Sequence, residues 1–392
     1  MSMAASSAAS WSPQQPRLRI DAVMLALVLA IVLLGLVMVT SASVSVASRE
    51  GGSFLYLQRQ LLLVAAGTAG AALVFCLRSE QIEAVSVPLM FAAFALLVLV
   101  FVPGLGHRVN GSRRWLSLAG FNFQASEGAR LCLLLYVAGY AVRREEELRG
   151  TFMGLVRPLG VLAAAGALLL AEPAFDAASV LFVTGFAMLF LAGARLRYVG
   201  LAVLAAAAGF VLLAMSSDYR VRRLTSFRDP FADPYHSGFQ LVQSLIAIGR
   251  GQWFGVGLGE SVQKLFYLPE AHTDFLFAVL AEELGLAGVV LTLGLFLALV
   301  WRSFHIARVA ARAGAKFGTY VAAGFGLWLG IQAFVNIGVN MGVLPTKGLT
   351  LPLMSYGRSS LIVALVWVGL VLRVYHEATA PPRGGMVARA PA

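Results

Sequence analysis

Apolar runs long enough to cross a lipid bilayer recur along this chain from residue 22 to residue 374. A membrane helix needs about 20 predominantly apolar residues. Because the bilayer core offers no water to bond exposed backbone groups, such runs must form helices or closed barrels. Charged residues make up only 12% of the chain, against about 25% in soluble domains. The sequence therefore predicts an all-α polytopic membrane protein.

We expect about ten transmembrane helices, of which the fourth, fifth and sixth are short or interrupted. The expected spans are 22–40, 54–76, 84–102, 127–141, 159–170, 177–192, 198–215, 275–301, 319–343 and 355–374. The first span is too long for the core of a signal peptide, so we expect it to stay. We expect a disordered cytoplasmic tail at 1–16, the transmembrane domain at 17–376 and a second cytoplasmic tail at 377–392.

The formal net charge is +11, and the basic residues gather in alternate connections between the spans. Cytoplasmic loops of membrane proteins carry such an excess of Lys and Arg, which anionic headgroups also attract. We therefore expect a multi-pass protein of the cytoplasmic membrane, with both termini in the cytoplasm and membrane lipids as partners. No basic surface with interleaved aromatic residues accompanies the charge, so we expect no nucleic-acid partner.

Two connections are longer than the others, and both fall on the predicted outer face. The first covers 103–126, and the second, 216–273, joins the seventh and eighth spans. Long ordered connections are usually functional, so we expect the chemistry on the outer face. The glycine run at 255–259 follows no strand and lacks a Gly-Lys-Ser/Thr ending, which argues against a phosphate loop and favours a tight or re-entrant bend.

The stretch 267–275 (Tyr-Leu-Pro-Glu-Ala-His-Thr-Asp-Phe) places Glu270, His272 and Asp274 at the start of the eighth span. A carboxylate at the mouth of a membrane helix is costly, and is therefore a candidate functional group. Alternatively, Thr273 is the N-cap of the helix and Asp274 lies in its first turn, where both interact favourably with the positive end of the helix dipole. Capping leaves Glu270 and His272 unexplained, so we interpret Asp274 as a general base or a metal-bridging carboxylate.

Three further groups each have a structural and a functional interpretation. Glu127 and Arg130 form either an ion pair at a helix start or part of a polar cavity. Basic side chains of the long connection either anchor it to headgroups or grip a lipid-linked pyrophosphate. They are Arg220, Arg222, Arg223, Arg228 and Lys264. Polar side chains near the ends of the last two spans, including Asn336, Asn340, Ser355 and Tyr356, either bond neighbouring helices or line the same cavity.

Seven short motifs follow one another along nearly the whole chain. They are 110–116 (Asn-Gly-Ser-Arg-Arg-Trp-Leu), 123–127 (Phe-Gln-Ala-Ser-Glu), 219–220 (Tyr-Arg), 238–240 (Gly-Phe-Gln), 267–275, 282–285 (Glu-Glu-Leu-Gly) and 351–357 (Leu-Pro-Leu-Met-Ser-Tyr-Gly). Together they resemble the SEDS family (shape, elongation, division, sporulation) of peptidoglycan glycosyltransferases. Ser-Val-Gln-Lys at 261–264 is more similar to the division branch of that family than to the elongation branch.

The resemblance implies an enzyme that polymerises lipid II into glycan strands on the outer face of the cytoplasmic membrane, at the division septum. It implies Asp274 as the catalytic carboxylate, Trp115 and Glu127 as further residues of the catalytic cavity, and Mg²⁺ or Mn²⁺ as a divalent cation. Arg220, Arg223 or Lys264, with that cation, would neutralise the departing undecaprenyl pyrophosphate. Further candidates for substrate contact are Arg114, Arg130, Glu270, His272 and Ser355. The implied partners are the class B penicillin-binding transpeptidase FtsI, the FtsQ–FtsL–FtsB complex and FtsN-type activators.

The chain departs from the family pattern at several positions. Glu172-Pro173-Ala174 stands where the family usually has Gln-Pro-Asp, so the carboxylate expected at position 174 is absent, and Glu172 and Asp176 are the candidates to replace it. Ala125 replaces a common proline, Arg130 a usual lysine and Arg358 a common glycine. Two alternatives to a polymerase stay open. One is a lipid II flippase, which should show inverted repeats and midplane charges, and the other is a non-catalytic division scaffold.

Overall fold

The structure is a computed structural model, and it describes residues 19–50, 52–109, 112–118, 121–215, 227, 229–236, 238–345 and 348–380. The tail expected at 1–16, most of the second tail, and Arg220, Arg222, Arg223 and Arg228 lie outside these described residues. Long helices form the body of the protein: α1 (Ala22–Glu50), α2 (Leu55–Cys76), α4 (Ser86–Leu99), α5 (Ala125–Arg143), α7 (Phe152–Ala171), α8 (Phe175–Leu191), α9 (Leu196–Met215), α12 (Leu276–Arg312), α13 (Lys316–Asn340) and α14 (Arg358–Thr379). Shorter helical pieces connect them: α3 (Ser79–Ala84), α6 (Glu145–Gly150), the 3-10 turn η1 (Pro230–Ala232) and α11 (Phe239–Gly251).

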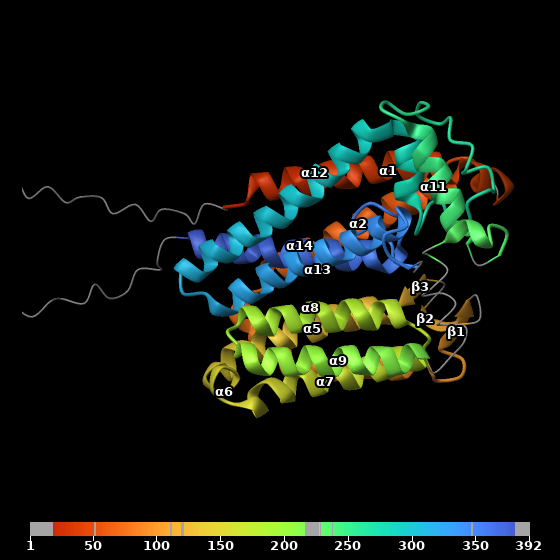
Figure 1. The fold of residues 1–392 in the computed structure, drawn as a ribbon. Coiled ribbons are helices and arrows are strands. Elements are labelled where there is room, and N and C mark those ends of the chain that lie inside the picture. The colour runs from red at the N-terminus through yellow and green to blue at the C-terminus, as the bar shows by residue number, and fades with distance from the viewer. Residues whose placement is uncertain are drawn as a thin grey trace, which may run out of the picture.

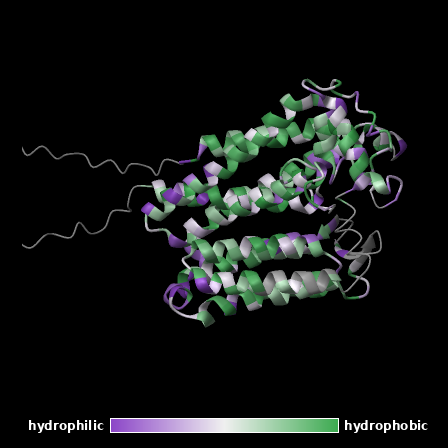
Figure 2. Cartoon of the chain, in the orientation of Figure 1, coloured by the Kyte–Doolittle hydropathy of each residue, from purple (hydrophilic) through white to green (hydrophobic). Residues whose placement is uncertain are grey.

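The polytopic helical fold predicted from the apolar runs is confirmed. Six of the described helices are long and apolar enough to cross a membrane, and two more, α4 and α8, are apolar but shorter. A helix lies at each of the ten expected spans, although the number of actual crossings stays a prediction. Figure 2 shows hydrophobic residues along the middle of the helices and hydrophilic residues gathered at the two ends of the bundle.

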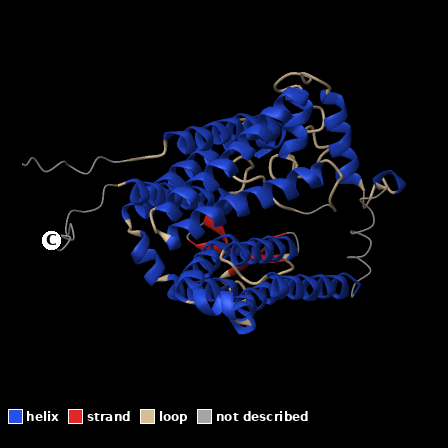
Figure 3. Ribbon diagram, turned by 60° about the vertical axis from the view of Figure 1, so that its left-hand side comes forward, coloured by secondary structure: helices blue, strands red, loops and turns tan. Residues whose placement is uncertain are grey.

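The helices run side by side in two groups (Figure 1). One group contains α1, α2, α12, α13 and α14, and the other contains α5, α7, α8 and α9; α13 packs against both α5 and α8 and so joins the groups. Figure 3 shows the same bundle from another side. Its core is aromatic where α13 meets α14: the rings of Trp328 and Trp367 stack with centroids 5.3 Å apart, and both side chains are buried.

The two ends of the bundle differ in character. At one end, which we call the terminal end, the first and last described segments meet, since the Arg19 side chain donates to the Thr379 carbonyl. Buried Asp21 pairs there with Arg302, and so joins α1 to α12. The opposite end, which we call the sheet end, carries both α11 and a small sheet (Figure 1).

The small sheet was not predicted from the sequence, which indicated only a long connection at 103–126. It is antiparallel in the order β1 (Gly106–Val109), β2 (Ser112–Leu118) and β3 (Phe121–Gln124). Among the described residues of the sheet, Leu116 packs into the apolar layer with Val100 and Ala125. The sequence does alternate at Leu116-Ser117-Leu118 and Phe121-Asn122-Phe123-Gln124, but only over three or four residues, at the lower limit of the length that indicates a strand. The backbone amide of Gln124 donates to Ser359 Oγ at 2.7 Å, which ties the sheet to α14.

A second departure from expectation is a break inside α12, which the sequence predicts as one continuous span. Gly285 has φ 64° and ψ −162°, which is not helical. The chain just after α11 bonds across the break: Val256 N donates to the Glu282 carbonyl at 3.0 Å, and Leu286 N donates to the Gln252 carbonyl at 2.9 Å. Gly255 makes this approach possible, because a Cβ there would lie 2.0 Å from the Glu283 carbonyl oxygen. The tight bend expected at the glycine run is therefore confirmed.

Candidate active site

Asp274 lies at the sheet end, immediately before α12, and its backbone is fixed by α13. The side-chain amides of Asn336 and Asn340 both donate to the Asp274 carbonyl, at 2.9 and 3.1 Å. The Asp274 side chain is half-buried and lies against Gly348, where a Cβ would come within 2.9 Å of its Oδ2. Of the two interpretations of Asn336 and Asn340, bonding to neighbouring segments is the one that this geometry supports.

Thr273 does not cap α12, although the structural interpretation of this stretch predicted that it would. Phe275, and not Thr273, occupies the N-cap position of α12, and its side chain cannot cap. Thr273 Oγ1 instead donates to the carbonyl and the carboxylate of Glu270, at 3.1 and 2.9 Å. The turn before α12 is thus closed by its own residues, and Asp274, directly before the N-cap residue Phe275, still lies near the positive end of the helix, where a carboxylate is favourable.

His272 and Ser355 are built into the wall around this turn. The His272 ring packs edge-on against Tyr56 of α2 with centroids 4.8 Å apart, and its carbonyl accepts from Tyr356 N at 3.0 Å. Ser355 is buried, and its Oγ accepts from Leu351 N at 3.0 Å. Both residues therefore shape the loop before α14, whereas Glu270 is exposed.

A stripe of polar and aromatic side chains connects Asp274 to the pair on α5. Trp328, Gln332, Asn336 and Asn340 are spaced four residues apart on α13, so they share one face of the helix. The Arg130 guanidinium carbon lies 5.2 Å from the Trp328 ring centroid, and Arg130 forms a buried ion pair with Glu127. The predicted ion pair is thus confirmed. Trp328, which contacts Arg130, and Asn340, which contacts Asp274, lie about 18 Å apart along α13 at roughly 1.5 Å per residue.

Several buried atoms along this stripe have no hydrogen-bond partner in the described part of the chain. They are Ser126 Oγ, Arg130 Nη1, Gln332 Oε1 and Asn336 Oδ1. Buried polar atoms of this kind usually hold ordered water. These atoms between α5 and α13 are therefore candidate positions for ordered water inside the bundle.

The sheet places the remaining predicted residues. Trp115 lies half-buried on β2, in register with Gln124 of β3. Arg114 donates to the carbonyls of Glu172 and Pro173 in the turn between α7 and α8. Because that guanidinium holds the turn in place, its contacts favour a structural role over the predicted contact with substrate.

Glu172 is a buried carboxyl group in that same turn, one residue beyond the apolar span of α7. It is 0% exposed, and neither of its carboxyl oxygens has a hydrogen-bond partner among the described residues. Burial raises the pKa of Glu172 from 4.5 to about 8, an effect that the nearby Arg114 charge only partly offsets. Near neutral pH, Glu172 is therefore mostly protonated, which suits a buried site better than a charged carboxylate would. Ala174 beside it is buried and adds no polar group.

We expect Glu172→Gln to stabilise the protein increasingly as the pH rises. Between about pH 4.5 and 8 the folded wild type retains a proton that its unfolded chain has lost, so its free energy of unfolding falls as pH increases. Glutamine is neutral throughout, which removes a cost of up to roughly 3–5 kcal/mol at the alkaline end. Thermal unfolding in detergent from pH 5 to 8.5 measures the difference, with the exposed Glu146→Gln as the control. Parallel curves for Glu172→Gln and the wild type would contradict the prediction.

Metal binding can be judged from the carboxylates that the structure brings together. Among the described residues, no three His, Cys, Asp or Glu side chains form a metal-binding group. Mg²⁺, however, is commonly held by one or two carboxylates together with phosphates of the substrate. The Asp274 carboxylate suits that shared mode, in which the cation would be held only together with a pyrophosphate.

Sequence reasoning missed the environment of Lys264 and of Glu283. Lys264 was predicted to contact substrate, but it is only 7% exposed and its ammonium pairs with Glu283 of α12 at 2.8 Å. The available signal was the carboxylate pair Glu282 and Glu283 inside an apolar run, because buried charges require partners. Ser41 of α1, which also contacts Lys264, carried no such signal.

A bundle of membrane helices, with a carboxylate on a fixed backbone and a buried polar stripe, defines a polytopic integral membrane protein with a polar site at one end of its bundle. Residues 21–380 match the FtsW/RodA/SpoVE family, described as "Cell cycle protein". The chain belongs to this family, and the predicted SEDS membership is confirmed.

Relatives and solved structures cover nearly the whole chain. "Probable peptidoglycan glycosyltransferase FtsW" of Thioalkalivibrio sulfidiphilus is 55% identical over 94% of this chain and 93% of its own length. The protein of the same name from Alkalilimnicola ehrlichii is 53% identical, over 90% and 88%. A chain from "Structural coordination of polymerization and crosslinking by a peptidoglycan synthase complex" is 33% identical with TM-score 0.74, over 92% and 99%. Thermus thermophilus RodA is 31% identical with TM-score 0.68, over 93% and 99%.

Proposed function

We propose that this chain is a peptidoglycan glycosyltransferase of the FtsW type that polymerises lipid II during septal cell-wall synthesis. The observation that carries the proposal is the placement of Asp274: a half-buried carboxylate at one end of a membrane bundle, on a backbone held by two asparagines of α13. The names of the relatives support the reaction class, since the match to the Thioalkalivibrio sulfidiphilus protein covers 94% of this chain and 93% of that protein.

In this proposal, Asp274 is the general base. It takes the proton from the acceptor sugar hydroxyl while that oxygen bonds to the anomeric carbon of the donor sugar from the face opposite the leaving group. The bond from the anomeric carbon to the pyrophosphate oxygen breaks, undecaprenyl pyrophosphate leaves, and the configuration inverts. The Asp274 carboxylate, together with the pyrophosphate, would hold a Mg²⁺ or Mn²⁺ ion, which would supply charge neutralisation for that leaving group. Arg220 and Arg223 are proposed to contact the same group, and Glu127, Arg130 and Trp115 to line the cavity.

The proposal also orients the protein. The sheet end, with Asp274, faces the outside of the cytoplasmic membrane, and the terminal end faces the cytoplasm, where the basic residues of the connections lie. An even number of crossings places both ends of the membrane domain on the same side, and Arg19 and Thr379 do meet at one end of the bundle. A class B transpeptidase, FtsI, is the proposed partner, together with FtsQ–FtsL–FtsB and FtsN-type activators at the septum. One structural relative comes from a study of a peptidoglycan synthase complex, which supports a transpeptidase partner.

Polymerisation of lipid II by the purified protein with its class B partner tests the proposal. We expect glycan strands in the presence of Mn²⁺ or Mg²⁺, and none after chelation or in Asp274→Ala. Absence of glycan from an intact, folded complex with the cation present would reject the polymerase. Vesicle translocation of lipid II by that same preparation would then favour a flippase, and its failure would favour a scaffold.

A further inference from the structure

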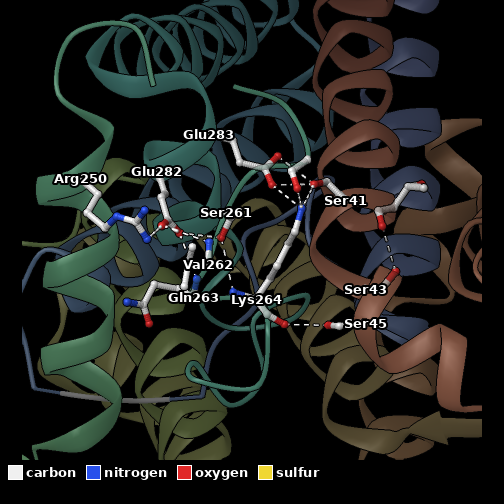
Figure 4. Close-up of polar contacts among 12 residues, drawn as sticks. Ser41, Ser43, Ser45, Arg250, Ser261, Val262, Gln263, Lys264, Glu282 and Glu283 are labelled. Carbon is white, nitrogen blue, oxygen red and sulfur yellow. Dashed lines mark hydrogen bonds and ion pairs between the residues drawn. The ribbon is translucent and has the colours of Figure 1, made fainter. Parts of the chain in front are cut away.

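Two adjacent carboxylates, Glu282 and Glu283, lie buried in the last turn of α12 before the break at Gly285. Each has its own cation (Figure 4). Arg250, at the end of α11, reaches Glu282 at 3.0 Å, and Lys264 reaches Glu283 at 2.8 Å. The part of α12 before the break is therefore joined to the preceding connection at two neighbouring residues.

Lys264 is the more enclosed of the two cations. Its ammonium donates to Glu283, to the Gly259 carbonyl at 2.6 Å and to Ser41 Oγ at 3.0 Å, which uses all three of its donors. Ser41 also donates to the Glu283 carboxylate at 2.7 Å, and the Lys264 carbonyl accepts from Ser45 Oγ at 2.7 Å. Lys264 thus fastens the connection to α1 and to α12 together, as Figure 4 shows.

The segment that follows Lys264 leads directly to Asp274. Its two ends are held by different helices: Lys264 by α1 and α12, and the Asp274 carbonyl by Asn336 and Asn340 of α13. Between them, Phe266 and Glu270 have φ of 69° and 57°. Side-chain-bearing residues adopt such angles only at a cost, and hold them where the surroundings fix the chain. The conformation of 265–274 therefore depends on its anchors.

We propose that Lys264 is a positioning residue: through its contacts with Glu283 and Ser41 it fixes the segment 265–274, and so the position of the Asp274 carboxylate relative to α1, α12 and α13. This inference rests on the proposed function only for its effect on rate; the anchoring itself does not. A buried ion pair adds little net stability compared with apolar side chains of similar size, and its contribution to specifying one conformation is the better account of why charges lie here.

A second buried ion pair provides a matched control. Asp21 and Arg302 join the same two helices, α1 and α12, but at the terminal end. Arg302 follows Glu283 by 19 residues, which places it about 28 Å along the helix at 1.5 Å per residue. Removing that pair loosens the same helix contact without touching the segment before Asp274.

The test compares two double variants, each of which removes both charges so that no buried charge is left unpaired. They are Lys264→Met with Glu283→Gln, and Asp21→Asn with Arg302→Met. The first is expected to lower kcat about 10- to 100-fold, as misplacement of a catalytic group does, with KM for lipid II changed by less than about twofold. It is also expected to speed amide hydrogen exchange in 265–275, whereas the second variant leaves both quantities as in the wild type.

Exchange in 265–275 separates this inference from the proposed function, because it needs no substrate. Unchanged exchange in the Lys264 double variant overturns the positioning role. An equal loss of kcat in the control variant does so as well, because the effect would then follow from general loosening of α1 against α12. If the wild type makes no glycan, the proposed function fails, and exchange alone decides: faster exchange confined to the Lys264 double variant supports the anchor.

Discussion

Asparagine at position 274 is expected to lower the rate of lipid II polymerisation by about 10³-fold, within the range of roughly 10²–10⁴ that a general base contributes. The substitution preserves the size of the side chain and removes its capacity to take a proton. The protein is expected to stay folded, because Asn336 and Asn340 bind the backbone carbonyl of residue 274, which the change leaves in place. Initial rates and thermal unfolding of the same preparation measure both effects.

The exposed carboxylate Glu260 of the same connection provides the control, and Glu260→Gln should polymerise at the wild-type rate. Titration with Mn²⁺ separates the two roles considered for Asp274. A lost metal ligand is partly compensated by more cation, whereas a lost base is not, so we expect no recovery in Asp274→Asn. A rate within about tenfold of the wild type would reject Asp274 as the base, given the size of that contribution.

Much of the fold was predictable, because apolar length is a local property of the sequence. Each expected span contains a helix, since a run of this length in lipid has few other ways to satisfy its backbone. The sheet and the break in α12 were not predictable in this way. In the strands at 106–124 the alternation extends over only three or four residues, as in Phe121-Asn122-Phe123-Gln124, so the segment was interpreted as a connection. The break at Gly285 depends on the chain at 252–256, which bonds to it from outside the helix.

The candidate site was found for the same local reason and only in part. Asp274 was conspicuous as a carboxylate at the mouth of an apolar run. Its neighbours in space come from positions far away in sequence, such as Asn336 and Gly348. Lys264 shows the limit most clearly: basic and close in sequence to Asp274, it was predicted to bind substrate, yet Ser41, 223 residues away, helps to bury it. Charge identifies a residue that needs a partner, and only the fold decides which partner it has.

Arg130→Met is expected to destabilise the protein by about 3–5 kcal/mol, because it leaves Glu127 charged and buried without its partner. Both side chains of this pair are almost fully enclosed, at 2% exposure for Arg130 and 7% for Glu127. Thermal unfolding in detergent measures the loss. As the control, Lys316→Met breaks the pair with the partly buried Glu145 at the terminal end, in which Lys316 is 59% exposed. It should change the unfolding temperature little, since ion pairs open to solvent contribute little.

The double variant Glu127→Gln with Arg130→Met then decides between the structural and the functional interpretation of the pair. Removing both charges eliminates the unpaired buried carboxylate, so most of the stability should return. If the pair only joins turns of α5, polymerisation should return with it. We expect it not to return, because Arg130 faces Trp328 on the α13 stripe that also holds Asp274. Glu127 lies in the first turn of α5 at the sheet end, beside Ser126, whose hydroxyl has no hydrogen-bond partner among the described residues. Full activity in the stable double variant would remove Glu127 from the proposed catalytic cavity and leave Asp274 as the catalytic carboxylate.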